Sequence, residues 1–200
     1  PDYDQNHGIL RAIPENYDGH SLELKIKSVQ KEDGSGWSYE SYSENGNLVL
    51  KIGDSDTYVY GRQVYNIVYT VRGVANLPTS SQIFWDANGD QWQQPFGEVA
   101  ARVHLPTDLA TSVNDEVACF TGVFVSAESA CTISKNEESN GEVIIFDTTR
   151  QLQAGETLTF EIPFADGTFA PYKMSSELVR KIIFWSITET IPTILALVVM

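Results

Sequence analysis

Short stretches in which apolar and polar residues alternate recur along this chain, and they constrain its fold more than any other feature. Residues 21–30 place Leu22 and Leu24 two positions apart, which is the period of a β-strand with one buried face. Residues 62–72 repeat this period in RQVYNIVYTVR and predict a long central strand. Helix-period patterns are absent before Ser175, so the alternation predicts sheets.

Turn residues separate these stretches. Residues 38–43 and 47–52 flank Asn45-Gly46, and this dipeptide predicts a hairpin because both residues tolerate positive φ. Five further strands are predicted, at residues 82–85, 98–105, 117–125, 142–146 and 157–164. Eight or nine strands joined by Gly, Asn and Asp favour an all-β fold, an antiparallel β-sandwich with at least seven strands in two packed sheets.

Composition limits the classes of partner. The chain has 200 residues, of which 42% are hydrophobic, and these suffice for one domain with a buried core. Its formal net charge is -14 with only 13 Lys and Arg, whereas binding to phosphates needs clustered basic residues. We therefore expect no nucleic-acid partner. The acidic surface is what solubility alone favours, so it identifies no substrate.

Cys119 and Cys131 are the two cysteines of the chain. A zinc site would need four ligands, and the histidines His7, His20 and His104 are far apart in sequence. The spacing also excludes a thioredoxin-like pair. Either a disulfide or two buried thiols remains, and the membrane context described next favours the disulfide, which would require an oxidising compartment.

The chain ends in the apolar run IIFWSITETIPTILALVVM, which begins at Ile182. Because the chain opens on Pro1 and stops inside this run, we expect the soluble part of a longer membrane protein, whose secretory signal would lie upstream. Ser175 or Ser176 is a suitable N-cap for a helix before the run. Arg180 and Lys181 would then lie in water, next to the headgroups.

Glu189 interrupts the apolar run and would cost about 2.5 kcal/mol or more at a bilayer centre. We therefore expect the membrane span to begin near Ile191. The predicted organisation is an extracytoplasmic β-sandwich at residues 1–172, a juxtamembrane helix at 173–190, and the start of a truncated transmembrane helix at 191–200.

Several motifs occur in an order that indicates a family. They are HGILRAIP at residues 7–14, YNIVYTVRG at 65–73, FWDANGDQW at 84–92 followed by Pro95, VHLP at 103–106, and Cys119 with Thr121-Gly122. This series resembles the YciQ-like predicted membrane proteins of bacteria, whose outer module is domain of unknown function 2207 (DUF2207). The resemblance covers residues 8–169.

The resemblance implies a signal peptide, a β-rich extracytoplasmic domain at the cell membrane, a membrane span and further segments. The family has no established enzymatic activity, so the resemblance implies none for this chain. One departure is that the family's first strand, which precedes the GILRAIP stretch, is not in this sequence, so we expect an edge of the predicted sandwich either to be missing or to lie upstream.

Asp86, Asn88 and Asp90 are the weak candidates for a metal site, because they have the alternate spacing of a calcium loop. The pattern then fails, since Gly89 comes at the fourth position instead of the sixth and Gly97 occupies the twelfth, where Glu is required. A tight polar turn explains the same residues, so we expect no metal and no cofactor.

Trp85 and Trp92 are the candidate ligand-binding residues, as a sugar-stacking or partner-binding surface. The alternative is that at least one of them fills the core. A glycosidase with paired carboxylates is conceivable from the 27 acidic residues, but no nucleophile elbow, phosphate loop or HExxH motif is present.

The sequence thus favours a non-catalytic extracytoplasmic domain of a membrane-anchored protein, serving in interaction, sensing or assembly at the cell envelope. Its expected partners are the membrane, through the C-terminal helix, and an envelope protein or glycan. The first alternative is a carbohydrate-binding module for envelope glycans, and a weaker one is a paired-carboxylate hydrolase.

Overall fold

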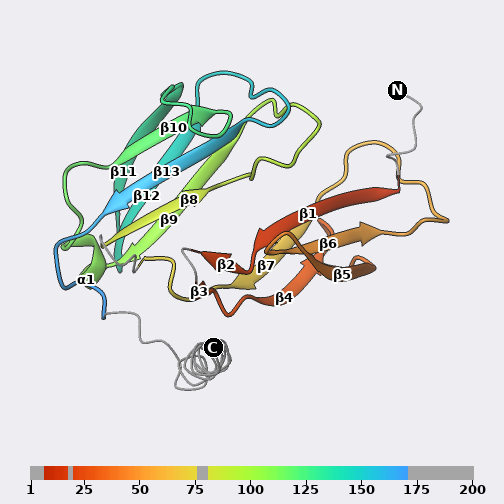
Figure 1. The fold of residues 1–200 in the computed structure, drawn as a ribbon, viewed down its shortest axis with the longest axis horizontal. Helices are drawn as coiled ribbons and strands as arrows, with labels where there is room; N and C mark the ends of the chain where they lie inside the picture. The colour runs from red at the N-terminus through yellow and green to blue at the C-terminus, as the bar shows by residue number, and fades with distance from the viewer. Residues whose placement is uncertain (1–6, 18–19, 76–80, 171–200) are drawn as a thin grey trace, which may run out of the picture. The chain divides into compact units, whose positions relative to one another are not determined.

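The structure, a computed structural model, describes residues 7–17, 20–75 and 81–170 (Figure 1), all within one unit, Pro1–Ala170. The predicted juxtamembrane helix and membrane span lie outside these residues. The described elements are β1 (Gly8–Pro14), β2 (Asn16–Tyr17), β3 (His20–Ser21), β4 (Lys25–Gln30), β5 (Tyr39–Glu44), β6 (Asn47–Gly53), β7 (Asn66–Thr70), β8 (Gln82–Asp86), β9 (Ala100–Pro106), α1 (Thr107–Ala110), β10 (Ala118–Gly122), β11 (Cys131–Glu138), β12 (Gly141–Thr148) and β13 (Thr157–Pro163).

Among the first seven strands, β1, β4, β6 and β7 contribute to one group of buried residues. A three-stranded sheet has the order β1-β6-β5, and β4 pairs with β7 in a second, two-stranded sheet. The buried side chains are Ile13, Val29, Leu50 and Ile52, named here the N-terminal cluster. They come from both sheets, so the alternating residues of each sheet turn one face toward the other.

The last six strands enclose a second group of buried residues. Two three-stranded sheets, β10-β13-β8 and β11-β12-β9, contribute to it. Phe146 of β12 stacks on Phe160 of β13 with ring centroids 5.0 Å apart, which shows that the two sheets face each other. The buried members of this C-terminal cluster are Val99, Leu105, Cys119, Ile144, Phe146, Leu152, Leu158, Phe160, Ile162 and Phe164.

The prediction of an all-β chain with antiparallel sheets is confirmed, since every pairing between the described strands is antiparallel. One difference concerns the core, because the strands divide between two clusters where the sequence suggested one pair of packed sheets. Alternation identifies the buried face of a strand, but it carries no information about which sheet covers that face.

The predicted hairpin at Asn45-Gly46 is confirmed. β5 and β6 pair with Glu44 opposite Asn47, and the two residues between them have φ values of 50° and 77°. Positive φ at both central positions is the geometry of a type I′ turn, whose twist matches that of the flanking strands.

Two predicted strands are shorter than expected. The strand predicted at residues 21–30 is interrupted at Glu23, whose φ is 46°. Only β4 forms a longer strand within this range. Residues 62–72 were predicted as a long central strand, but β7 covers five of them and pairs with β4 alone. The alternation persists beyond the ladder because it reports burial rather than strand pairing.

Three strands were not predicted at all, namely β1, β11 and the two-residue β2. β1 carries Arg11 within an otherwise apolar stretch, which obscures the alternation. In β11 seven of eight residues are exposed, so no buried face marks it in the sequence. These two longer strands are fixed by pairing, β1 with β6 and β11 with β12.

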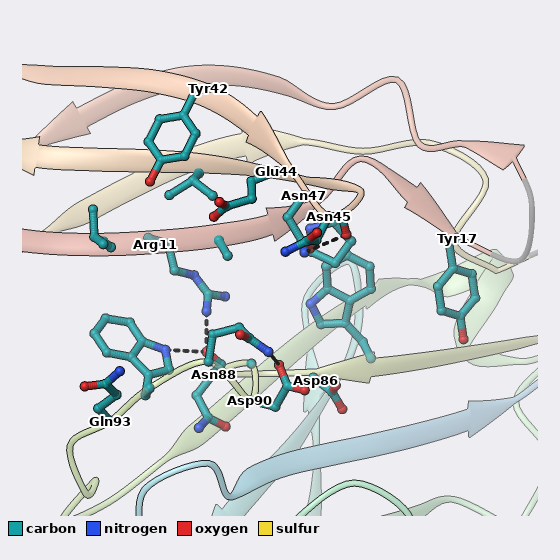
Figure 2. Close-up of a pocket in the computed structure, with 18 of the residues that line it drawn as sticks. Arg11, Tyr17, Tyr42, Glu44, Asn45, Asn47, Asp86, Asn88, Asp90 and Gln93 are labelled. Carbon is teal, nitrogen blue, oxygen red and sulfur yellow. Dashed lines mark hydrogen bonds between the residues drawn. The ribbon is translucent and has the colours of Figure 1, made fainter.

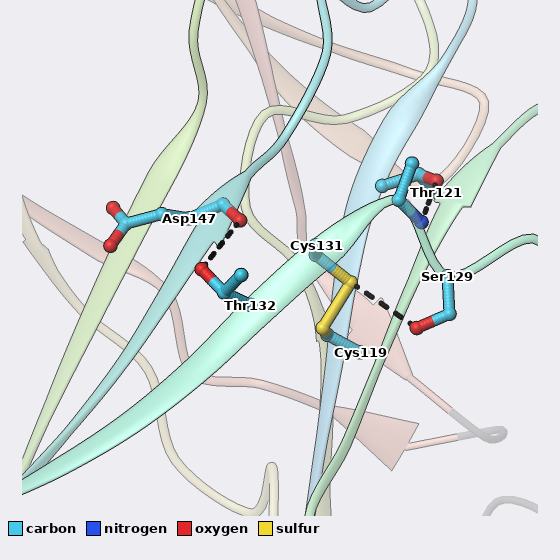
Figure 3. Close-up of a disulfide and its surroundings, with 7 residues drawn as sticks. Cys119, Thr121, Ser129, Cys131, Thr132 and Asp147 are labelled. Carbon is cyan, nitrogen blue, oxygen red and sulfur yellow. Dashed lines mark hydrogen bonds between the residues drawn. A yellow bond between two sulfur atoms is a disulfide. The ribbon is translucent and has the colours of Figure 1, made fainter.

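Cys119 and Cys131 form the predicted disulfide, with their sulfur atoms 2.13 Å apart (Figure 3). Cys119 belongs to β10 and Cys131 begins β11, so the bond links the two sheets around the C-terminal cluster. Beside it, the backbone N–H of Ala130 donates to Thr121 Oγ1 at 3.0 Å. The disulfide therefore holds both ends of the β10–β11 loop.

Candidate functional site

A groove of about 660 Å³ runs between the β1-β6-β5 sheet and the segment that begins in β8 (Figure 2). We name it the main groove. It is lined by Leu10, Arg11, Ala12, Pro14, Tyr17, Tyr42, Glu44, Asn45, Asn47, Val49, Phe84, Trp85, Asp86, Asn88, Gly89, Asp90, Gln91, Trp92 and Gln93. Its volume lies in the range of small-molecule sites.

One wall of the main groove is a face of the β1-β6-β5 sheet. Residues directly opposite each other in neighbouring strands point to the same face, so the wall consists of cross-strand rows. The rows that line the groove are Ala12–Val49–Tyr42 and Pro14–Asn47–Glu44. This wall therefore presents an aromatic ring, an amide and a carboxylate.

Both predicted tryptophans belong to the opposite wall. Trp85 is half-buried and packs against the C-terminal cluster while it also lines the groove. The indole N–H of Trp92 donates to the carbonyl oxygen of Asn88 at 2.7 Å, and its ring meets the ring of Phe96 edge to face at 5.3 Å. The structure thus brings the two residues together at one groove and fixes the orientation of Trp92.

The three weak metal candidates have other partners. The Asn88 side chain donates to the carbonyl of Glu156 and accepts from the N–H of Leu158, both at 2.9 Å. Asp86 accepts from the hydroxyl of Thr159. Asp90 Oδ1 accepts from Gln91 Nε2 at 2.8 Å. The bonds of Asp86 and Asn88 tie the end of β8 and the residues after it to the start of β13, which is a structural role, whereas the Asp90–Gln91 bond is local.

No group of three or more His, Cys, Asp and Glu residues within the described ranges is arranged to hold a metal ion. The prediction of a tight polar turn at Asp86–Asp90 is compatible with the bonds of Asn88, which is buried. The region is more than a simple hairpin turn, because residues 87–99 lead from β8 to β9, which belongs to a different sheet.

Arg11 bridges the two walls and was missed by sequence reasoning. Its Nη1 donates to the carbonyl of Asn88 (Figure 2). Its Nη2 donates to the carbonyl of Ala87 at 3.4 Å. A Cβ on Gly89 would lie 3.2 Å from Arg11 Nη1, so glycine permits this approach. Burial lowers the pKa of Arg11 from its ordinary value. A single Arg inside the apolar stretch GILRAIP was the available signal.

The charges of the main groove favour uncharged or cationic ligands. Glu44, Asp86 and Asp90 line it, and Arg11 is its one cationic residue among those described. The Arg11 guanidinium already donates to two backbone carbonyls. An anionic ligand would therefore face three carboxylates with little compensation.

The remaining lining groups are mainly aromatic rings and side-chain amides. The described residues of the main groove include no Ser, Thr, Cys, Lys or His. Aromatic rings offer flat apolar faces, and side-chain amides both donate and accept hydrogen bonds. The amide residues are Asn45, Asn47, Asn88, Gln91 and Gln93. Of these amide residues, Asn88 alone was a candidate site residue in the sequence.

A second surface feature is the tip of the β10–β11 loop. Val123, Phe124 and Val125 are 60%, 83% and 87% exposed. Val125 has a φ of 63°, which is rare for a β-branched residue. The disulfide and the bond from Thr121 N to the carbonyl of Glu128, at 2.6 Å, hold the base of this loop.

Antiparallel sheets, a disulfide and an open groove define the class of this protein as a disulfide-linked all-β domain. Residues 4–164 match the N-terminal domain of the predicted membrane proteins of family DUF2207, and the chain belongs to this family. The resemblance inferred from the motifs is thereby confirmed. No curated protein and no solved structure shows significant similarity to the chain.

Membership of this family makes the chain a domain of a membrane-associated protein. None of the helices within residues 7–17, 20–75 and 81–170 has the length and apolar character needed to cross a bilayer. The apolar run from Ile182 lies outside these ranges.

Proposed function

We propose that this chain is a non-catalytic recognition domain on the extracytoplasmic side of the cell membrane, and that its main groove binds an uncharged envelope glycan. The observation that carries the proposal is the meeting of Trp85 and Trp92 with Tyr42 and side-chain amides in one groove. Sugar rings stack on aromatic faces through their C–H groups, while their hydroxyls need paired donors and acceptors such as amides.

The disulfide supports the extracytoplasmic side. Cys119 and Cys131 are bonded to each other, and such bonds persist in oxidising compartments rather than in the cytosol. For a membrane-associated protein this favours the outer side of the membrane. The apolar run from Ile182 supplies the proposed anchor.

The charge of the main groove supports an uncharged ligand. Glu44, Asp86 and Asp90 repel phosphate-bearing polymers, and the overall charge of -14 adds to this repulsion. Nucleic acids are disfavoured for the same reason.

A paired-carboxylate hydrolase is the second candidate, because the same three carboxylates line the groove where a sugar would lie. Binding without cleavage distinguishes the proposed domain from such an enzyme. Chromatography of the bound oligosaccharide after prolonged incubation decides this, since shortened products that disappear in Glu44→Gln, Asp86→Asn or Asp90→Asn variants would establish the hydrolase.

The binding test is isothermal titration of the full chain with neutral oligosaccharides of glucose, mannose and N-acetylglucosamine, in a detergent that has no sugar headgroup. We expect Trp92→Ala to weaken binding by roughly tenfold or more, because a central aromatic contact is lost. Tyr60→Ala is the matched control, since Tyr60 is 75% exposed and lies outside the groove. Absence of binding to every neutral sugar would refute the glycan proposal.

A further inference from the structure

The main groove continues beyond Trp92 into a second hollow. This second groove has a volume of about 490 Å³ and is lined by His7, Gly8, Ile9, Leu10, Lys51, Ile52, Gly53, Asp54, Ser55, Gln91, Trp92, Gln93 and Gln94. Four residues, Leu10, Gln91, Trp92 and Gln93, line both grooves. The two hollows are therefore neighbours that meet at Leu10 and Trp92.

Along the path from the main groove to the second groove, residue numbers fall on one wall and rise on the other. Along β1 the lining passes from Pro14 in the main groove to Gly8 in the second groove. Along the other wall it passes from Phe84 to Gln94. β1 has seven residues, and at about 3.3 Å per residue it extends over roughly 20 Å. A path of this length exceeds one sugar ring.

We propose that the ligand is a linear chain of several uncharged sugar units, which lies along β1 and crosses from the main groove into the second groove at Trp92. This inference rests on the proposed glycan-binding function and adds the form of the ligand. A monosaccharide or a branched cap would use one groove and leave the other empty.

The residues where the two grooves meet fit a sugar chain that passes from one groove into the other. Leu10 is 56% exposed although it is apolar, and Trp92 lies on the facing wall with its indole N–H held by Asn88. A ligand that covers both side chains removes apolar surface from water. Because Trp92 is already hydrogen-bonded, its ring does not need to be ordered when the ligand binds.

The second groove also suits an uncharged chain. Its amides are Gln91, Gln93 and Gln94, and its charged residues Lys51 and Asp54 carry opposite signs. The main groove contributes mainly aromatic rings and side-chain amides, which suit a sugar chain. The second groove extends this lining with Trp92 and the three Gln amides.

The test is a length series of β-1,4-linked N-acetylglucosamine oligomers, from the dimer to the hexamer, titrated into the full chain in a detergent without a sugar headgroup. We expect affinity to rise on the order of tenfold from dimer to hexamer, because two linked subsites are filled together. If another neutral sugar binds better, its own length series replaces this one.

A variant that blocks the second groove tests whether the gain in affinity from dimer to hexamer comes from that groove. Ser55→Trp places a bulky ring in the second groove, so the hexamer should bind no better than the dimer while dimer affinity is retained. Thr57→Trp is the matched control, because Thr57 is exposed nearby and does not line the second groove. It should leave the length dependence unchanged.

The outcomes separate the two proposals. Equal affinity for dimer and hexamer, or a hexamer affinity that Ser55→Trp leaves unchanged, overturns the linear-chain inference while the glycan function stands. Binding of no neutral sugar of any length overturns both.

Discussion

The guanidinium of Arg11 donates a hydrogen bond to the carbonyl of Asn88, which lies 77 residues further along the chain. The same carbonyl oxygen accepts from the indole of Trp92, and the Asn88 side chain bonds to the backbone of Glu156 and Leu158. Asn88 thus connects β1, the groove tryptophan and β13. Loss of one of these hydrogen-bond partners of Asn88 should lower the stability of the protein and change the shape of the main groove.

We expect Arg11→Met to lower the free energy of unfolding by about 1–3 kcal/mol, because the buried Asn88 carbonyl loses a charged donor. Urea denaturation measures this change. Arg72→Met is the control, since the Arg72–Glu23 pair, at 3.5 Å, is largely exposed and should contribute little. Equal effects of the two variants would contradict the bridging role of Arg11.

Removal of the disulfide should lower stability without loss of the fold. The Cys119→Ser/Cys131→Ser double variant should be less stable by about 3 kcal/mol, since a loop with a sequence separation of 12 is freed in the unfolded chain. Thermal unfolding followed by circular dichroism measures the loss, with the wild type in reductant as a parallel sample. An unfolded variant at room temperature would show that the C-terminal cluster depends on this bond.

Gly46→Ala should destabilise the β5–β6 hairpin by about 1–2 kcal/mol, because an L-residue is strained at a φ of 77°. No atom lies within 4 Å of the added Cβ, so the cost is that of the backbone alone. Gly36→Ala is the control, as its Cβ also meets nothing and its φ lies outside the left-handed region. Chemical denaturation of both variants gives the comparison.

We expect the ion pairs of Arg150 to make stability depend on pH below about 5. Its hydrogen bonds lower the pKa of Glu128 and of Glu156 from the ordinary value of 4.5. A lowered folded-state pKa contributes stability that is present above the unfolded-state pKa and is lost as pH falls through the folded-state pKa. We therefore expect Arg150→Gln to flatten the decline of Tm between about pH 5 and pH 3.

The control for this pH series is Arg62→Gln. The Arg62–Glu32 pair is highly exposed, with side chains 77% and 70% accessible, so its loss should leave the pH dependence of Tm unchanged. If Arg150→Gln keeps the wild-type slope, other carboxylates cause the acid destabilisation.

Val125→Gly should raise the free energy of unfolding by about 1 kcal/mol, because glycine relieves the strain of a positive φ at a β-branched residue. Val125 is 87% exposed, so little packing is lost. Val123→Gly is the matched control at the same tip and should not stabilise the protein. Differential scanning calorimetry distinguishes the two.

The features that the sequence predicted correctly depend on neighbouring residues or on residue chemistry. Asn45-Gly46 specifies its turn because both residues tolerate positive φ, whatever surrounds the hairpin. Cys119 and Cys131 had each other as the one possible cysteine partner in the chain. The ordered motifs likewise indicated the family to which the chain belongs.

Tertiary structure decided two features, which are the division of the core into two buried clusters and the formation of the main groove. Alternation in β7 and β9 shows which side chains avoid water, but pairing across the chain decides what covers them. Arg11 is one charged residue in an apolar stretch until packing places the carbonyl of Asn88 within its reach. The sequence alone therefore determined the local turns, the cysteine pair and the strand-rich class. The tertiary structure decided the groove, because its walls come from segments that meet only when the chain is folded.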